Sequence, residues 1–114
     1  MNEISDCMIH IVDAALLRYL ERINARAREG DQQLPAFNVA KAREGGWRMF
    51  AEGWISMICG DNGVELKLTA SHTKRDENRC RHRPIVARYL DMASHGAFDR
   101  APEQLREDAQ AGFH

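Results

Sequence analysis

The chain has 114 residues, a length that suits one hydrophobic core and a single domain, 1–114, rather than two domains. Hydrophobic residues make up 44% and charged residues 29%, a composition that excludes a disordered chain and predicts a folded globular protein. The 16 basic and 17 acidic side chains leave a net charge of -1, which excludes a global field that would attract nucleic acid or an anionic membrane.

The first predicted element is a long helix over about 4–29. Apolar residues recur there at every third or fourth position between Ile4 and Ile23. Asp6 suits the positive start of a helix, and Gly30 suits a left-handed stop at its end. Such a helix is about 39 Å long, whereas a compact domain of this size is roughly 30 Å across. We therefore expect part of the helix to project, or to pair with a second copy of the chain in a homodimer.

The second predicted element is a helix over about 39–58, with Asn38 as its N-cap. Its apolar residues fall on one stripe, opposite charged residues. A competing interpretation ends this helix early and places a β-hairpin at 54–69. Three glycines disfavour the long helix, and Asn62 followed by Gly63 is a strong hairpin signal. The helical period favours the longer helix.

The remaining elements are a loop and two further helices. The segment 71–83 contains no apolar residue except Cys80, and we expect it to be a solvated, basic loop. Pro84 suits the first turn of a helix over about 84–95. A weaker helix is predicted over about 100–111.

Together these elements predict a mainly α fold: a compact helical domain of three to four helices with one short extended segment or β-hairpin. The alternative is an α+β fold with the hairpin at 54–69. No apolar run approaches the ~20 residues of a membrane span, and the acidic start does not resemble a signal peptide, so we expect a cytoplasmic protein with no membrane partner. The three cysteines are too few for a disulfide framework and are expected to be free thiols.

Positive charge is gathered in the segment 71–83, and this is the most distinctive feature of the sequence. The segment carries +3 with its histidines neutral, so the rest of a chain with a total of -1 carries -4. Guanidinium groups suit phosphates and acidic side chains, whereas the lack of aromatic residues among them disfavours base stacking. The alternative is a linker whose charges only keep it solvated. The candidate partner- or phosphate-binding residues are Lys74, Arg75, Arg79, Arg81 and Arg83.

An apolar interface is the second candidate site. If the second helix extends to residue 58, it has more large apolar side chains than one buried stripe can hold. We therefore predict that Met49, Trp54 and Ile55 form an exposed patch for a protein partner or a second copy.

Metal binding is a weaker alternative. Four candidate ligands occur with the spacing C-x12-H-x7-C-x-H, which lacks the paired knuckles of structural zinc sites. The sequence has no P-loop, GxGxxG, HExxH or GxSxG motif, so no cofactor is predicted and an enzyme is unsupported. The candidate ligands are Cys59, His72, Cys80 and His82.

These features predict a non-catalytic binding or regulatory protein. It would act through protein–protein contacts and through its arginine-rich segment, with contact to a nucleic acid backbone as a further expectation. Thirteen of the 16 basic residues are arginines, a bias typical of GC-rich bacterial or phage genomes, and an inhibitor of a host nucleoprotein complex fits this description. The alternative is a small enzyme that depends on zinc or on its Cys and His side chains.

Overall fold

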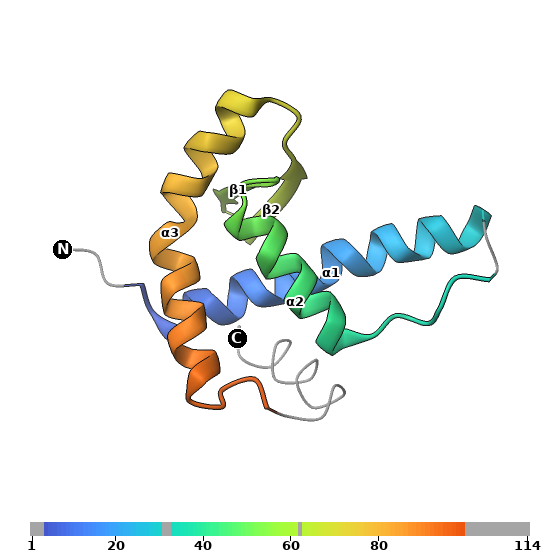
Figure 1. The fold of residues 1–114 in the computed structure, drawn as a ribbon, viewed down its shortest axis with the longest axis horizontal. Helices are drawn as coiled ribbons and strands as arrows, with labels where there is room; N and C mark the ends of the chain where they lie inside the picture. Colours follow the sequence, from blue (N-terminus) through green and yellow to red (C-terminus); the bar gives the residue numbers. More distant parts are fainter. Residues whose placement is uncertain (1–3, 31–32, 62, 100–114) are drawn as a thin grey trace.

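The computed structural model describes residues 4–30, 33–61 and 63–99. The fold is mainly α with one antiparallel hairpin, as the composition of predicted elements indicated. The weak helix predicted over 100–111 lies outside the described residues. The elements in chain order are α1 (Asp6–Gly30), α2 (Val39–Ala51), β1 (Ile55–Gly60), β2 (Gly63–Leu68) and α3 (His72–Ser94) (Figure 1).

α1 begins at a serine cap, and only its first half is buried. The Ser5 hydroxyl accepts a hydrogen bond from the Met8 backbone N–H at 3.1 Å, and Asp6 lies in the first turn. The buried residues of α1 fall between Ile9 and Leu17, whereas nearly all of its last ten residues are exposed. The second half extends away from the other helices and the hairpin (Figure 1). Part of α1 therefore projects, and pairing with a second copy stays a prediction.

α2 begins where the sequence predicted and ends earlier. The Asn38 side chain accepts a hydrogen bond from the Lys41 backbone N–H at 3.1 Å, which confirms Asn38 as the N-cap. The prediction of a helix over 39–58 is wrong beyond Ala51, because the chain turns at Gly53 and continues as a strand.

Gly53 ends α2 for two physical reasons. The Gly53 N–H donates to the Phe50 carbonyl at 3.1 Å and the Trp54 N–H donates to the Met49 carbonyl at 3.0 Å, the two bonds that close a helix before a left-handed residue. Gly53 has a φ of +84°, which favours glycine. A Cβ at this position would also lie 2.2 Å from the Arg75 carbonyl oxygen on α3. Only glycine fits both conditions.

β1 and β2 form the hairpin that the alternative interpretation placed at 54–69. The register pairs Gly60 with Gly63, so two residues connect the strands. Ile55 and Leu66 are buried in the core, and they lie on the same face of the hairpin because Leu66 pairs with Met57, two residues after Ile55. Within the described part of the chain, neither strand pairs with a further strand.

α3 corrects the prediction of a solvated loop over 71–83 followed by a helix over 84–95, because a single helix covers both segments. Ser71 caps it: the hydroxyl accepts a hydrogen bond from the Lys74 backbone N–H at 3.3 Å. Pro84 lies inside the helix and removes one N–H from its hydrogen-bond ladder. α3 curves along its length (Figure 1), as expected of a helix that contains an internal proline.

The inward face of the first half of α3 is polar, which explains why apolar periodicity did not reveal a helix there. Asn78 and His82 are each 1% exposed, although the segment has almost no apolar residue. Asn78 and His82 lie four residues apart on one face of the helix. After Pro84, apolar residues continue this face at intervals of three and four residues. The complete inward stripe is Arg75, Asn78, His82, Ile85, Tyr89 and Met92.

A buried ion pair joins α1 to α2 at one side of the core. Arg43 donates through Nε to Asp13 Oδ1 at 3.0 Å and through Nη2 to Oδ2 at 2.9 Å, and both residues are buried. Trp47 donates through Nε1 to Asp13 Oδ1 at 2.8 Å, and its ring stacks on Tyr89 of α3 with centroids 4.0 Å apart. The carboxylate therefore accepts from two donor side chains on α2, which satisfies both of its oxygens.

Candidate functional site

The predicted cationic residues lie on α3 but have different surroundings. Arg75 is half-buried and faces the hairpin: its guanidinium carbon lies 3.7 Å from the centroid of the Trp54 ring, and its Nε donates to the Glu52 carbonyl at 3.0 Å. These contacts hold the start of α3 against the end of α2. Arg75 therefore has a structural role, which separates it from the exposed cations of α3.

Two further cations are paired by acids of the same helix. Lys74 Nζ lies 3.6 Å from a Glu77 carboxylate oxygen, and Arg79 forms an ion pair with Asp76. All four side chains are exposed, and such pairs contribute little to stability. They nevertheless reduce the charge that these two cations present to a partner.

Arg81 and Arg83 are exposed, and neither forms an ion pair or a side-chain hydrogen bond with another described residue. Two residues apart on a helix, they point about 200° apart around its axis. Arg83 lines a groove beside α2, whereas Arg81 does not. α3 thus presents two unneutralised guanidinium groups on different sides.

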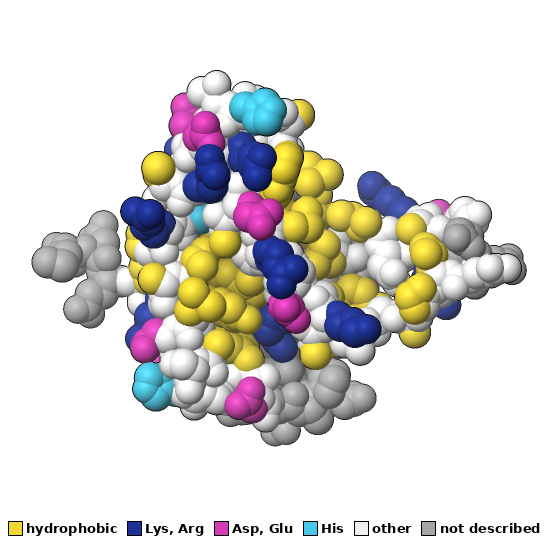
Figure 2. Space-filling model, viewed as in Figure 1, with side chains coloured by type: hydrophobic (Ala, Val, Ile, Leu, Met, Phe, Trp, Pro, Cys, Tyr) yellow, Lys and Arg dark blue, Asp and Glu magenta, His cyan; other side chains and the backbone are white. Residues whose placement is uncertain are grey.

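A groove with a volume of about 590 Å³ contains several of the predicted site residues. It runs along one side of α3 and includes Ala51 at the end of α2. Its charged residues belong to the first half of α3, and its apolar residues Val86, Ala87 and Leu90 follow Pro84 on the same helix. Figure 2 shows a hydrophobic patch between α2 and α3, with Lys and Arg side chains around it. The lining residues are Ala51, Asp76, Arg79, Cys80, Arg83, Val86, Ala87 and Leu90.

The predicted interface patch is not formed as expected. Ile55 is fully buried in the core, because it begins β1 instead of continuing α2. Met49 is half-buried and packs against the core. Trp54 is half-buried beneath Arg75 and donates through Nε1 to the Glu52 carboxylate at 3.2 Å. The exposed apolar surface beside α2 is instead the groove, whose most prominent member is Leu90, with 59% of its surface exposed.

His82 is a core residue and not a metal ligand or a surface charge. Its ring stacks on Phe50 with centroids 3.7 Å apart, and Nδ1 donates to the Phe50 carbonyl at 3.0 Å. That bond makes Nδ1 the protonated nitrogen, and the buried Nε2 has no hydrogen-bond partner among the described residues. Burial lowers the pKa of His82; the bond to Phe50 opposes this shift and the charge of Arg81 adds to it.

Asn78 fixes α3 on the hairpin one turn before His82. Its amide nitrogen lies 3.2 Å from the Gly53 carbonyl, 3.0 Å from the Ser56 hydroxyl and 3.0 Å from the Thr69 hydroxyl. No motif or apolar period in the sequence marks Asn78 as a site residue. Its only signal was its position three residues after Arg75 and four before His82, which completes a helical stripe.

The candidate metal ligands are not brought together. Cys59 lies at the exposed end of the hairpin, His72 and Cys80 are exposed on α3, and His82 is buried. In the described ranges, no three or more His, Cys, Asp or Glu side chains gather in a way that would hold a metal ion. The zinc-dependent alternative therefore has no geometric support there.

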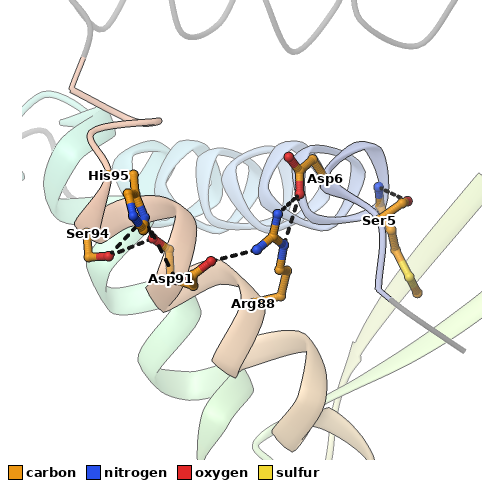
Figure 3. A network of polar contacts seen from close by, with 7 residues as sticks. Ser5, Asp6, Arg88, Asp91, Ser94 and His95 are labelled. Atoms are coloured by element: carbon orange, nitrogen blue, oxygen red, sulfur yellow. Dashed lines mark hydrogen bonds and ion pairs between the residues drawn. The ribbon is translucent and has the colours of Figure 1, made fainter. Parts of the chain in front are cut away.

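A surface network at the other end of α3 contains serine, histidine and aspartate without forming a catalytic triad. Arg88 donates to Asp6 and Asp91, which ties the start of α1 to the end of α3 (Figure 3). His95 Nδ1 and the Ser94 hydroxyl both donate to the Asp91 backbone carbonyl, at 2.8 and 2.7 Å. Ser94 Oγ also lies 3.4 Å from His95 Nδ1, but this nitrogen carries the proton that it donates to the carbonyl. It therefore cannot accept the serine proton, and nucleophilic catalysis would require that transfer.

Comparison of the chain with protein-family models, curated protein sequences and solved structures finds no match. Among the described helices, none combines the length and apolar character needed to cross a bilayer.

Proposed function

We propose that this chain is a non-catalytic binding protein that uses the exposed cationic side of α3 around Arg83 to hold an acidic protein partner. The observation that carries the proposal is the state of Arg83, which is exposed without an ion pair in the described structure and lines the groove. It belongs to a helix that carries +3 in a chain whose total charge is -1. Exposed positive charge speeds the encounter with an acidic protein surface and orients that surface as the two proteins approach.

A protein partner suits this surface better than a nucleic acid backbone. Asp76 and Glu77 lie among the cations and would repel phosphates, whereas a protein partner can avoid them with its own charge pattern. An apolar groove also lies directly beside Arg83, and apolar contacts have no role in gripping phosphates. Contact with a nucleic acid backbone is the alternative, and binding of a short DNA duplex would support it.

We further propose a regulatory role in the cytoplasm of a bacterium or of a phage host. All three cysteines are exposed and free in the structure, a state that persists in a reducing compartment. Inhibition of a host nucleoprotein complex is one form of regulation that a small cationic binding surface suits.

Charge reversal on α3 tests the proposal. We expect the double variant R79E and R83E to lose binding to fluorescent poly-L-glutamate at low salt, with an almost unchanged melting temperature, because both side chains are exposed. The matched control reverses two exposed arginines on the projecting half of α1: R22E and R26E. Both variants change the net charge equally.

The control separates a binding surface from net charge. Equal loss of poly-L-glutamate binding in both variants would contradict the proposal, because total charge alone would then account for it. Binding of a short DNA duplex but not poly-L-glutamate, with loss only in the α3 variant, would replace the protein partner with nucleic acid.

A further inference from the structure

The groove beside α3 has two chemically different halves on a single helical stripe. Arg79, Arg83, Val86 and Leu90 follow one another by four, three and four residues, so they lie along one side of the helix. The stripe adjoins the inward stripe that packs on the core. It therefore changes from cationic to apolar along its length while remaining open to solvent.

Arg83 is the free charge of this stripe. Arg79 is already held by Asp76, whereas Arg83 has no ion-pair partner in the described chain. Two turns further on, Leu90 is 59% exposed, and Val86 and Ala87 lie between them. Arg83 and Leu90 are seven residues apart, a separation of about 10 Å along a helix.

We propose that this groove receives an amphipathic acidic segment of the partner, with a carboxylate on Arg83 and an apolar side chain against Val86, Ala87 and Leu90. The inference rests on the proposed function and specifies the partner at the same surface. Charge complementarity selects an acidic occupant, and the apolar half selects a peptide over a polyphosphate. An occupant helix with a glutamate and a leucine seven residues apart matches the spacing of about 10 Å.

The probe is a fluorescent helical peptide of about 14 residues with leucine and glutamate at that spacing. We expect Arg83→Glu to weaken its binding about tenfold or more, because a favourable charge contact becomes repulsive. Arg81→Glu is the matched control, since Arg81 is also exposed and unpaired in the described chain but lies outside the groove. It should change the affinity less than about twofold.

The apolar half is tested in the same way. We expect Leu90→Ser to weaken peptide binding about tenfold while it leaves the weaker binding of poly-L-glutamate unchanged. Leu68→Ser is the control, because Leu68 is similarly exposed, at 62%, but lies on β2 away from the groove. This control should leave peptide binding unchanged.

Cys80 provides an independent readout within the groove. It lines the hollow, and Cys7 and Cys59 are also exposed but lie elsewhere. Saturating peptide should slow the alkylation of Cys80 by iodoacetamide, measured by mass spectrometry, and leave the other two thiols reacting at their original rates.

The outcomes distinguish failure of the groove as the binding site from failure of acidic-partner binding as the function. Equal weakening by Arg83→Glu and Arg81→Glu, or unprotected Cys80, would overturn the groove and leave a diffuse cationic surface. Failure of every acidic probe to bind would overturn the proposed function as well. Displacement of the peptide by rising concentrations of the chain itself would identify a second copy as the occupant and would also overturn the proposal.

Discussion

The backbone of Gly53 is constrained by two elements, α2 and α3. Its φ of +84° closes α2, and the missing side chain lets the Arg75 carbonyl of α3 approach. We expect Gly53→Ala to destabilise the fold by about 3 kcal/mol, because a left-handed alanine and an overlapping Cβ both cost free energy. Urea unfolding followed by circular dichroism measures this change.

Gly45 supplies the control, since a Cβ added there meets nothing within 4 Å and the residue lies inside α2. Gly45→Ala should stabilise the fold by about 0.5 kcal/mol through helix propensity. A similar effect of both substitutions would contradict the role assigned to Gly53.

His82 makes the stability of the fold depend on pH. Burial lowers its pKa below the ordinary value near 6.5, so the unfolded chain takes up the proton more readily. The stability that neutral His82 provides is therefore fully present above about pH 6.5 and is lost as the pH falls toward its lower folded pKa. The slope reaches at most about 1.4 kcal/mol per pH unit for one proton.

Replacing His82 with glutamine should remove most of this slope in urea unfolding measured between pH 7.5 and about 4.5. His95→Gln is the control, because the side chain of His95 is 76% exposed and lies in the surface network. An unchanged slope in the His82 variant would show that other groups cause the pH dependence.

Among the contacts between elements, the buried pair of Asp13 and Arg43 links α1 to α2 most specifically. Asp13→Ala would leave a buried guanidinium without its carboxylate, and we expect a loss of about 3–5 kcal/mol. Combining Asp13→Leu with Arg43→Met removes both charges and should recover at least half of that loss. The remaining deficit reflects the Trp47 N–H, which loses its acceptor.

A double-mutant cycle from thermal and urea unfolding measures the coupling between the two positions. Additive effects of the single substitutions would contradict a specific pair.

The elements differ, for physical reasons, in how far the sequence predicts them. Apolar residues that mark its buried side predict α1, and Asn38 is predictable as an N-cap because side-chain capping is a local interaction. The hairpin signal at 62–63 was also local, but the helical period of the preceding residues outweighed it. That period could not reveal the close approach of Arg75 to Gly53, which depends on a distant segment.

The candidate site was predicted only in part, because burial of α3 uses polar side chains. Asn78 and His82 occupy positions where a helix normally presents apolar residues, so their segment resembled a loop. The sequence shows that the cations share one segment, but their separation into structural, paired and free groups depends on three-dimensional contacts. The groove likewise requires α2 and α3 to lie together.

For the molecule as a whole, α1 divides into a buried half and a projecting half. We expect amides of residues 22–30 to exchange with deuterium much faster than those of residues 9–17, because helices without buried contacts open locally. Hydrogen exchange with mass spectrometry at low micromolar concentration measures this difference. Pairing of the projecting halves in a homodimer would instead protect residues 22–30 as the concentration rises.

The two tryptophans lie in different surroundings. The fluorescence of each one should therefore report on a different structural change. Trp54 is half-buried under a guanidinium at the start of α3, whereas Trp47 is buried and stacked on a tyrosine inside the core. Fraying of the first turns of α3 would alter the signal of Trp54 alone, and global unfolding would alter both. Single replacements by phenylalanine would therefore give two intrinsic reporters without any attached dye.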